Sequence, residues 1–154
     1  MSDPVNLYDL ELSGDSANPE GYRGRGAGIT ESIGGDRLGG SVYEIGPGDS
    51  TAPYHFEGVE EEWLLVLTGT PTLRDPTGEH ELVPGDLVCF PVGPEGAHKL
   101  TNASGEVARV LMLSTVPKPD VSICVYPDSD KMSVWPPGKR VRMTPDVDYW
   151  DGEA

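Results

Sequence analysis

A histidine and a dense run of acidic residues stand directly before an apolar stretch in PYHFEGVEEEWLLVLTG, residues 53–69. His55 and Glu57 are separated by one residue, so on an extended strand their side chains point to the same face. Glu62 begins the apolar stretch and shares a face with every second residue of it, which predicts that its carboxylate faces a core. A buried carboxylate must be paired, protonated or bound to a cation. The spacing therefore favours a metal-binding site over a solvated acidic loop.

A second histidine, His98, begins a predicted strand after the glycine-rich bend in PVGPEGAHKLTN. Two imidazoles and two carboxylates suit Zn²⁺, Mn²⁺, Fe²⁺ or Ni²⁺. The predicted metal ligands are therefore His55, Glu57, Glu62 and His98. Glu61 replaces Glu62 if the strand is shifted by one residue, because such a shift exchanges the two faces. The alternative is a barrel without metal in which Glu57 points to solvent, and the sequence by itself assigns no catalytic residue.

Short strands must position these side chains, because 20 glycines and 15 prolines in 154 residues disfavour long helices. Residues 1–18 are expected to form an edge strand or an arm, residues 21–40 a loop, and the tail after residue 127 shows little periodicity. About eight strands joined by Gly, Pro and Asp turns suit a closed barrel or a jelly roll. Their expected ranges are 40–45, 50–57, 61–69, a hairpin within 70–86, 86–92, 97–102, 106–115 and 122–127.

Other reactive or large side chains receive simpler interpretations. Glu60 and Glu61 are expected to be solvated turn residues, and His80 a surface residue beside the hairpin turn. Cys89, in the middle of a predicted strand, is expected to be a small core residue. Trp63 and Phe90 are expected in the core or at an interface. The basic cluster GKRVR, residues 138–142, is interpreted as a local counter-charge to an acidic body.

The acidic and histidine-containing segment resembles the first motif of the cupin superfamily, G-x5-H-x-H-x3,4-E-x6-G. The chain matches it, in order, with Gly48, His55, Glu57, Glu62 and Gly69. The spacings that flank Glu62 are those of the motif. Six residues instead of five separate Gly48 from His55. Glu57 stands where the second histidine of the family usually is.

The second cupin motif, G-x5-P-x-G-x2-H-x3-N, is similar to a segment that begins at Gly85. It is followed by Pro91, Gly93, His98 and Asn102, with two extra residues between Gly93 and His98. The order VPGDLVCFPVG followed by AH is distinctive. The flanking sequences are similar to those of bacterial single-domain cupins, or monocupins, that carry a C-terminal extension.

The resemblance implies an all-β fold, the double-stranded β-helix or jelly-roll cupin barrel, with a divalent transition metal inside its mouth. It divides the chain into an N-terminal arm and Gly-rich loop (1–38), a cupin barrel (39–126) and a C-terminal extension packed on the barrel (127–154). The carried-over ligands are again the two histidines and two glutamates. Two carboxylates bring a divalent ion to zero net charge, whereas the usual one carboxylate and three histidines leave one positive charge. The metal is therefore expected to be a weaker Lewis acid.

Charge and cysteine usage limit the partners. A net charge of −15 repels phosphate backbones and anionic membranes, so no nucleic acid or membrane partner is expected. The two cysteines form no CxxC pair, no secretory signal pattern starts the chain, and no apolar run approaches the ~20 residues of a membrane helix. We expect a cytoplasmic protein with reduced thiols. Apolar positions within residues 1–18 suggest a homodimer in which a partner covers a sheet edge.

Three classes of function fit these observations. The first is a metal-dependent enzyme that acts on a small polar metabolite, as an isomerase or epimerase, a lyase, or an iron-dependent dioxygenase. The second is a non-catalytic sensor or small-molecule-binding cupin with a structural metal, and the third is a metal-free interaction scaffold. The two carboxylate ligands disfavour the iron-dependent dioxygenase. Isomerase chemistry tolerates such a mixed ligand set and is therefore ranked above it. Fold alone does not decide among these classes.

Overall fold

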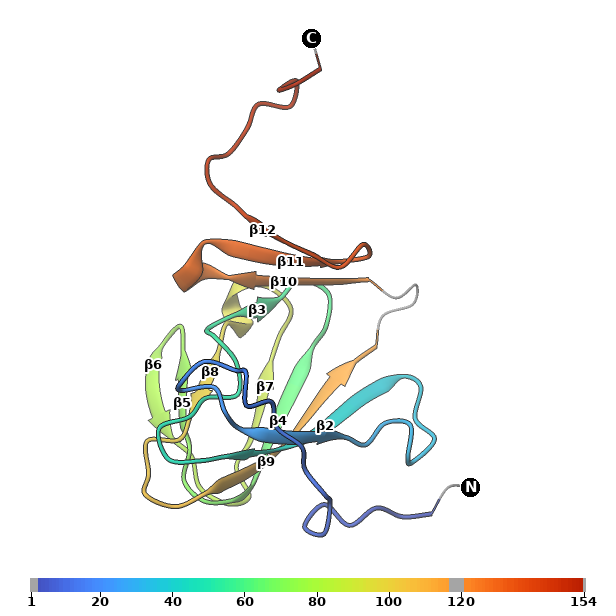
Figure 1. The fold of residues 1–154 in the computed structure, drawn as a ribbon, viewed down its shortest axis with the longest axis vertical. Coiled ribbons are helices and arrows are strands. Elements are labelled where there is room, and N and C mark those ends of the chain that lie inside the picture. Colours follow the sequence, from blue (N-terminus) through green and yellow to red (C-terminus); the bar gives the residue numbers. More distant parts are fainter. Residues whose placement is uncertain (1–2, 117–120, 154) are drawn as a thin grey trace.

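The computed structural model describes residues 3–116 and 121–153, and these residues form twelve strands in three antiparallel sheets (Figure 1). The five-stranded sheet has the order β1 (Arg25–Gly28), β2 (Leu38–Ile45), β9 (Ala108–Thr115), β4 (Glu62–Thr68) and β7 (Leu87–Phe90). The four-stranded sheet has the order β12 (Lys139–Arg142), β11 (Lys131–Trp135), β10 (Ser122–Tyr126) and β3 (Phe56–Glu57). The three-stranded sheet has the order β6 (Gly78–Glu81), β5 (Thr72–Asp75) and β8 (Lys99–Thr101).

Helical structure in the described residues is limited to two 3₁₀ turns, η1 (Pro94–Gly96) and η2 (Pro127–Ser129). The prediction of an almost entirely β protein is therefore confirmed. None of the described residues forms a helix of the length and apolarity needed to cross a membrane.

The core lies where the inward faces of the strands meet. On β4, Leu64 and Val66 are buried while Trp63 is exposed and Leu65 half-buried, as the two-residue period of a strand requires. The core cluster of buried side chains comprises Ile45, Leu64, Val66, Leu73, Leu82, Phe90, Leu100 and Val110. Glu62 lies at the start of β4, on the face of Leu64 and Val66, so the predicted register is the observed one.

Asn102 fixes the turn between β8 and β9 to the end of β2. Its side chain is fully buried, and its Nδ2 donates hydrogen bonds of 2.7 Å to the carbonyl oxygens of Ile45 and Glu106. Its Oδ1 accepts from the backbone N–H and the hydroxyl of Ser104. A buried amide with these partners connects segments that are distant in sequence, and all of its own hydrogen-bonding groups are satisfied.

Several predicted strand boundaries are wrong. The expected strand over residues 50–57 is reduced to β3, because Pro53 and the turns around it leave only isolated bridges at Ser50 and His55. The glycine-rich segment 21–40 was expected to be a loop, but it contains β1, which pairs with β2. Missing side chains on Gly26 and Gly28 hide the alternation that would have indicated a strand.

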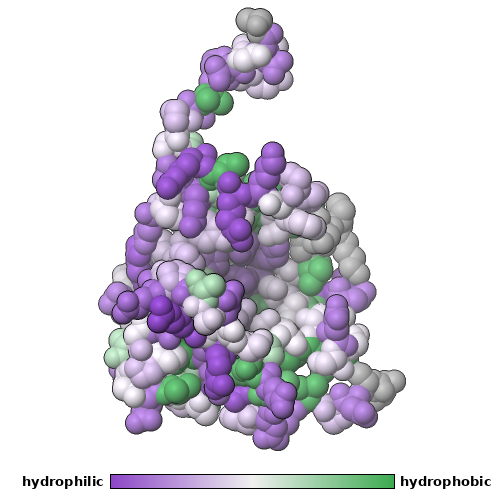
Figure 2. All heavy atoms as spheres, viewed as in Figure 1, coloured by the Kyte–Doolittle hydropathy of each residue, from purple (hydrophilic) through white to green (hydrophobic). Residues whose placement is uncertain are grey.

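The tail also contains strands that its weak periodicity did not predict. β11 pairs with β10 over five residues, and β12 pairs with β11 over four. The predicted boundary at residue 126 thus falls between hydrogen-bonded strands of one sheet. Beyond Arg142 the chain runs away from the barrel (Figure 1). Hydrophilic side chains cover the upper body where β11 and β12 lie (Figure 2).

Cys89 and Trp63 face outwards, so the prediction of a core position for Cys89 is wrong. Cys89 is exposed and Trp63 is 42% exposed, whereas Phe90 is buried as predicted. Val88 and Phe90 occupy the inward positions of β7, which leaves Leu87 and Cys89 on the outer face. His80 is exposed on β6, where its Nε2 lies 3.3 Å from Asp75, as the sequence predicted.

Candidate metal centre

His55 and His98 are brought together by a pair of backbone hydrogen bonds. The His55 N–H donates to the His98 carbonyl at 3.0 Å, and the His98 N–H donates back at 2.8 Å. Residues that pair in this antiparallel way project their side chains to the same face. The two ring centroids are accordingly 4.6 Å apart.

Each of these histidines has its ring orientation fixed by a carbonyl two residues before it. His55 Nδ1 donates to the Pro53 oxygen at 2.8 Å, and His98 Nδ1 donates to the Gly96 oxygen at 2.9 Å. The His98 ring also stacks on Phe90, with centroids 3.7 Å apart and planes 9° apart. Both Nε2 atoms are therefore free acceptors, which is the arrangement that metal-binding histidines adopt.

Glu62 aims a carboxylate at both imidazoles. Its Oε2 lies 3.9 Å from His55 Nε2 and 3.7 Å from His98 Nε2. Donor atoms around a tetrahedral ion with 2.0–2.1 Å bonds lie about 3.3 Å apart, so each of these two carboxylate–imidazole distances needs to shorten by only about half an ångström. The Glu62 Oε2 is buried and has no hydrogen-bond partner. A cation between the three residues would satisfy it.

Glu57 also approaches the free nitrogen of His55. Its Oε1 lies 3.8 Å from His55 Nε2, and its Oε2 is buried without a hydrogen-bond partner. The described residues contain two groups whose ligand atoms lie within 4.8 Å of one another: His55, Glu62 and His98 form one, and His55, Glu57 and Cys124 form the other. The four predicted ligands are therefore gathered at one place, with His55 common to both groups.

Burial shifts the charges of all four residues towards neutrality. It raises the pKa of Glu57 and that of Glu62 to about 7, and neighbouring carboxylates add to the shift. Burial, together with nearby His55, lowers the pKa of His98 to about 4, and burial also lowers the pKa of His55. A divalent cation binds neutral imidazoles and ionised carboxylates, and its charge would offset the repulsion between two closely spaced carboxylates. The residues present thus fit a metal ion.

Two features of the site were not predicted from the sequence. Glu60 was expected to be solvated, but its Oε2 is buried without a hydrogen-bond partner, close enough to Glu57 and Glu62 to raise their pKa values. The sequence did not predict a role for Cys124. The only local indication of its inward direction was the alternating apolar pattern of its strand. Glu61, in contrast, turns outwards and accepts a hydrogen bond from Trp63 Nε1 at 2.8 Å.

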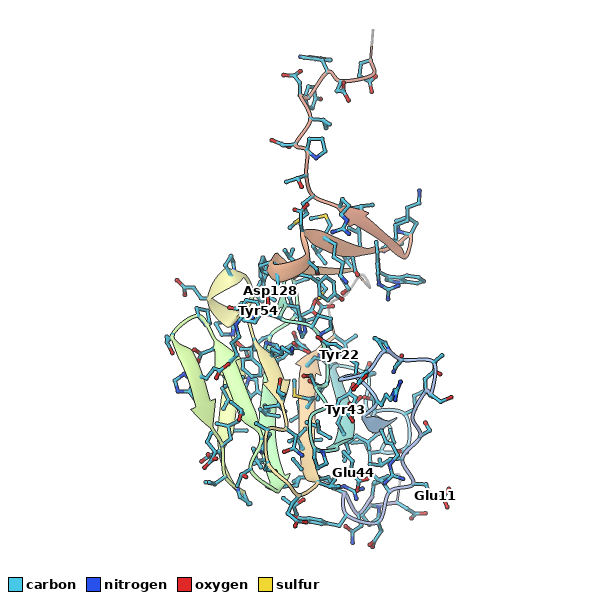
Figure 3. The ribbon with its side chains drawn as sticks, turned by 60° about the vertical axis from the view of Figure 1, so that its left-hand side comes forward. Glu11, Tyr22, Tyr43, Glu44, Tyr54 and Asp128 are labelled. Carbon is cyan, nitrogen blue, oxygen red and sulfur yellow. The ribbon has the colours of Figure 1, made fainter. Side chains whose placement is uncertain are left out.

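A small hollow opens beside Glu62. It has a volume of about 250 Å³ and is lined by Thr30, Tyr43 and Met112 among others. A larger hollow of about 450 Å³ lies between the N-terminal segment and β1–β2, lined by Tyr22, Tyr43 and Glu44 (Figure 3). The larger hollow is lined by none of the predicted ligands. The smaller one is therefore the better candidate for a substrate of the metal centre.

Residues 41–114 match the family model of the cupin domain. This matched segment contains both histidines and both glutamates of the site. The fold agrees with this match, because a solved structure from the cupin superfamily covers 97% of the chain. The protein is a cupin. No curated protein matches the sequence.

Two solved structures cover this cupin almost completely. A protein of Acidithiobacillus ferrooxidans, provisionally named a sugar phosphate isomerase, is 25% identical and has a TM-score of 0.79, covering 92% of this chain and 90% of its own. A cupin sugar phosphate isomerase of Silicibacter pomeroyi is 24% identical with a TM-score of 0.80, covering 97% and 98%. The polyketide cyclase RemF of Streptomyces resistomycificus is 24% identical with a TM-score of 0.63, covering 77% and 82%.

The coverage of the first two structures extends well beyond the residues that match the family model. The jelly-roll architecture predicted from the two motifs is thereby confirmed. The C-terminal sheet of this cupin is joined to the barrel through Arg74 on β5. Its guanidinium donates to Asp128 at 2.5 and 3.1 Å and lies 3.9 Å from the ring centre of Tyr54 (Figure 3).

Proposed function

We propose that this cupin binds one divalent transition-metal ion and catalyses an isomerase, epimerase or lyase reaction on a small polar metabolite. The ion is held by His55, Glu62 and His98, with Glu57 as a fourth ligand. Zinc, manganese, iron and nickel all accept this donor set. The main support is Glu62 Oε2, which is buried, has no hydrogen-bond partner and faces the Nε2 atoms of His55 and His98. The Nδ1 atom of each of these histidines already donates a hydrogen bond to a backbone carbonyl.

An isomerase requires polarisation of a carbonyl and movement of a proton on a neighbouring carbon. A bound divalent ion would supply the polarisation, as a Lewis acid. Glu60 is a carboxylate of the site that is not among the proposed metal ligands. Its buried oxygen lies near the two glutamate ligands. We assign the proton transfer to Glu60. Glu61 cannot take this role because it faces outwards and is bonded to Trp63.

The dimensions and charge of the molecule restrict the substrate. The hollow beside Glu62, at about 250 Å³, is smaller than the ~300–1,000 Å³ of typical ligand pockets, which favours a metabolite of a few carbon atoms. The resemblance to the Acidithiobacillus protein favours a polyhydroxylated carbonyl compound. A net charge of −15 disfavours a highly anionic one. We therefore expect short sugars or hydroxyketones with at most one phosphate.

The first experiment measures metal content in protein purified without a metal-binding tag. Zinc or manganese at one equivalent supports isomerase or lyase chemistry, and iron supports the alternative of a dioxygenase. Absence of any bound ion, even after dialysis against each metal, would overturn the metal centre and leave a scaffold.

The second experiment tests the reaction by NMR in deuterated water, with aldoses, ketoses and their monophosphates as substrates. We expect deuterium to enter at the carbon beside the carbonyl in metal-loaded protein. The Glu60→Gln variant should exchange about 10²–10⁴ times more slowly at unchanged metal content, because general acid–base catalysis typically contributes that factor. Glu61→Gln is the matched control and should exchange like the wild type. Metal binding with no exchange on any substrate would favour the sensor alternative.

A further inference from the structure

Cys124 lies directly opposite Glu57 in the sheet that closes the barrel mouth. The two residues are register partners between antiparallel β10 and β3. Directly opposite residues in such a pair project to the same face, with Cβ atoms about 4.5–5.5 Å apart. Both side chains therefore enter the site from the C-terminal sheet, whereas Glu62 and His98 enter from the barrel.

The sulfur of Cys124 is within reach of the shared histidine. Cys124 is 7% exposed, and its Sγ, a Glu57 oxygen and a His55 ring nitrogen lie within 4.8 Å of one another. The Glu57 Oε2 is buried and has no hydrogen-bond partner. Tyr126, two residues further along β10, packs its ring 5.9 Å from that of His55.

The group of His55, Glu57 and Cys124 offers nitrogen, oxygen and sulfur donors. The group of His55, Glu62 and His98 offers only nitrogen and oxygen. Thiolate sulfur prefers soft ions such as zinc and cadmium, whereas carboxylate and imidazole donors alone accept manganese as readily. His55 offers a single free nitrogen, because its Nδ1 donates to Pro53. One ion at a time can therefore use it. Cys124 also lies beyond residues 41–114, so the part of the chain that matches the family model does not supply this donor.

We propose that Cys124 is a metal ligand, and that with His55 and Glu57 it forms a second, sulfur-containing position that soft divalent ions occupy in preference to the first. The proposal rests on the proposed metal centre. Binding converts the thiol to a thiolate as the sulfur–metal bond forms, and the thiol proton passes to the solvent. Hard ions such as manganese remain at the position of His55, Glu62 and His98. The site thus selects its metal by moving the ion between two positions.

Cobalt(II) provides the direct test, because a thiolate bound to cobalt gives an intense sulfur-to-metal absorption band in the near ultraviolet. Metal-free protein is titrated with cobalt, and wild type is compared with Cys124→Ser and Cys89→Ser. We expect the band in wild type and in Cys89→Ser, and its loss in Cys124→Ser. Cys89 is a matched control because it is the chain's other cysteine and is exposed on the outer face of the barrel.

Cadmium and manganese affinities, measured by competition with a coloured chelator, provide the second readout. Cys124→Ser should weaken cadmium binding by at least about tenfold, the lower bound that even the outer partners of a metal contribute. Manganese affinity should stay within about twofold of wild type, because its donors are unchanged. Circular dichroism checks that the Cys124→Ser variant is folded. If the variant does not fold, the cobalt spectrum of the wild type still tests whether sulfur binds the metal.

The outcomes separate this proposal from the proposed function. Saturated cobalt binding without the band in wild type would overturn the role of Cys124, leaving it as a hydrogen-bond donor to Glu57, while the metal centre stands. An equal loss of cadmium and manganese affinity in Cys124→Ser would also overturn it. Failure of wild type to bind cobalt, cadmium or manganese at all would overturn the metal centre as well.

Discussion

At the scale of single residues, the site is defined by carboxylates whose charge has no protein partner. The Oε2 atoms of Glu57, Glu60 and Glu62 are all buried without a hydrogen bond. Leaving a polar atom in this state costs free energy, more so when the group is charged. Without metal, protonation relieves this cost for Glu57 and Glu62, which is why the pKa of each is raised to about 7. These residues destabilise the metal-free protein and strengthen its affinity for a cation.

Removing the charge of Glu62 should stabilise the metal-free protein and abolish metal binding. Its folded-state pKa of about 7 exceeds its ordinary value of 4.5, so its contribution to stability is complete below pH 4.5 and is lost as pH rises through 7. In chelator at pH 8, Glu62→Gln should therefore be more stable than wild type, by on the order of 1–3 kcal/mol. Thermal or urea unfolding at pH 6 and pH 8 measures the difference, which should shrink at the lower pH.

The neighbouring variant Glu61→Gln is the control for this measurement. It removes the same formal charge, but Glu61 faces outwards and its amide replacement still accepts from Trp63. We expect wild-type metal content and a similar pH dependence of unfolding. Equal effects of the two substitutions would show that only net charge matters and that Glu62 has no special environment.

Glu57→His distinguishes a ligand from a bystander. If Glu57 coordinates the ion, the substitution gives three imidazoles and one carboxylate and leaves one positive charge on a divalent centre. A bound water should then ionise at lower pH than in wild type, with metal retained. The pH dependence of the spectrum of the cobalt-loaded protein measures this ionisation. Unchanged metal content together with an unchanged ionisation would exclude Glu57 as a ligand.

At the scale of elements, short and irregular segments position the ligands. β3 contains only two residues, and His55 is held by a single bridge to His98. The bend before His98 is equally constrained, because the 3₁₀ turn η1 packs Gly96 against Pro91. A Cβ on Gly96 would lie 1.9 Å from the Pro91 carbonyl oxygen. The glycine is required by close approach of backbone, and the Gly96 carbonyl orients the His98 ring.

Gly96→Ala should therefore disturb both folding and metal binding. The clash involves backbone atoms that cannot rotate away, so the bend must move and displace His98. We expect a loss of unfolding free energy of about 1–3 kcal/mol or more, as overpacking produces, and a reduced metal content at equal total metal. Denaturant unfolding and elemental analysis measure the two effects.

Gly105→Ala is the matched substitution in the next loop, where an added Cβ meets nothing within 4 Å. It should leave stability within about 0.5 kcal/mol of wild type, as surface substitutions usually do. A Gly96→Ala protein with wild-type stability and metal content would show that the bend does not determine the position of His98.

At the scale of the whole molecule, the outer face of the five-stranded sheet is apolar. Leu38 and Leu87 are each 57% exposed there and Trp63 is 42% exposed. A hollow of about 210 Å³ lined by Leu38, Trp63 and Leu113 lies on the same face. Contiguous exposed apolar residues on a sheet commonly mark a protein interface. The homodimer and the cytoplasmic location stay predictions, and this face is a better candidate for the dimer contact than residues 1–18.

We expect analytical ultracentrifugation at micromolar concentration to give the mass of a dimer. Trp63→Glu should weaken the dimer by at least about tenfold, because a charge would be buried at the centre of the contact. Tyr149→Glu is the control, since Tyr149 is 84% exposed on the tail that runs away from the barrel. A wild-type protein that sediments as a monomer would contradict the prediction.

Local sequence patterns determined the class of the fold and much of the site. Side chains two apart share a face of a strand, so His55 and Glu57 could be placed together, and the apolar run after Glu62 fixed its inward direction. The motif spacing added His98 from a distant segment. The high content of glycine and proline excluded long helices. These inferences depend on neighbours in sequence, or on a spacing that resembles a known family.

Only the tertiary structure decided which outer segments complete the site. Cys124 meets Glu57 because β10 pairs with β3, and pairing between distant strands leaves no local signal in the sequence. Cys89 illustrates the converse: β7 carries apolar residues on both faces, so its two-residue period shows that faces alternate without showing which one is buried. Periodicity specifies relative orientation within one strand, and the packing of other strands determines what each face contacts.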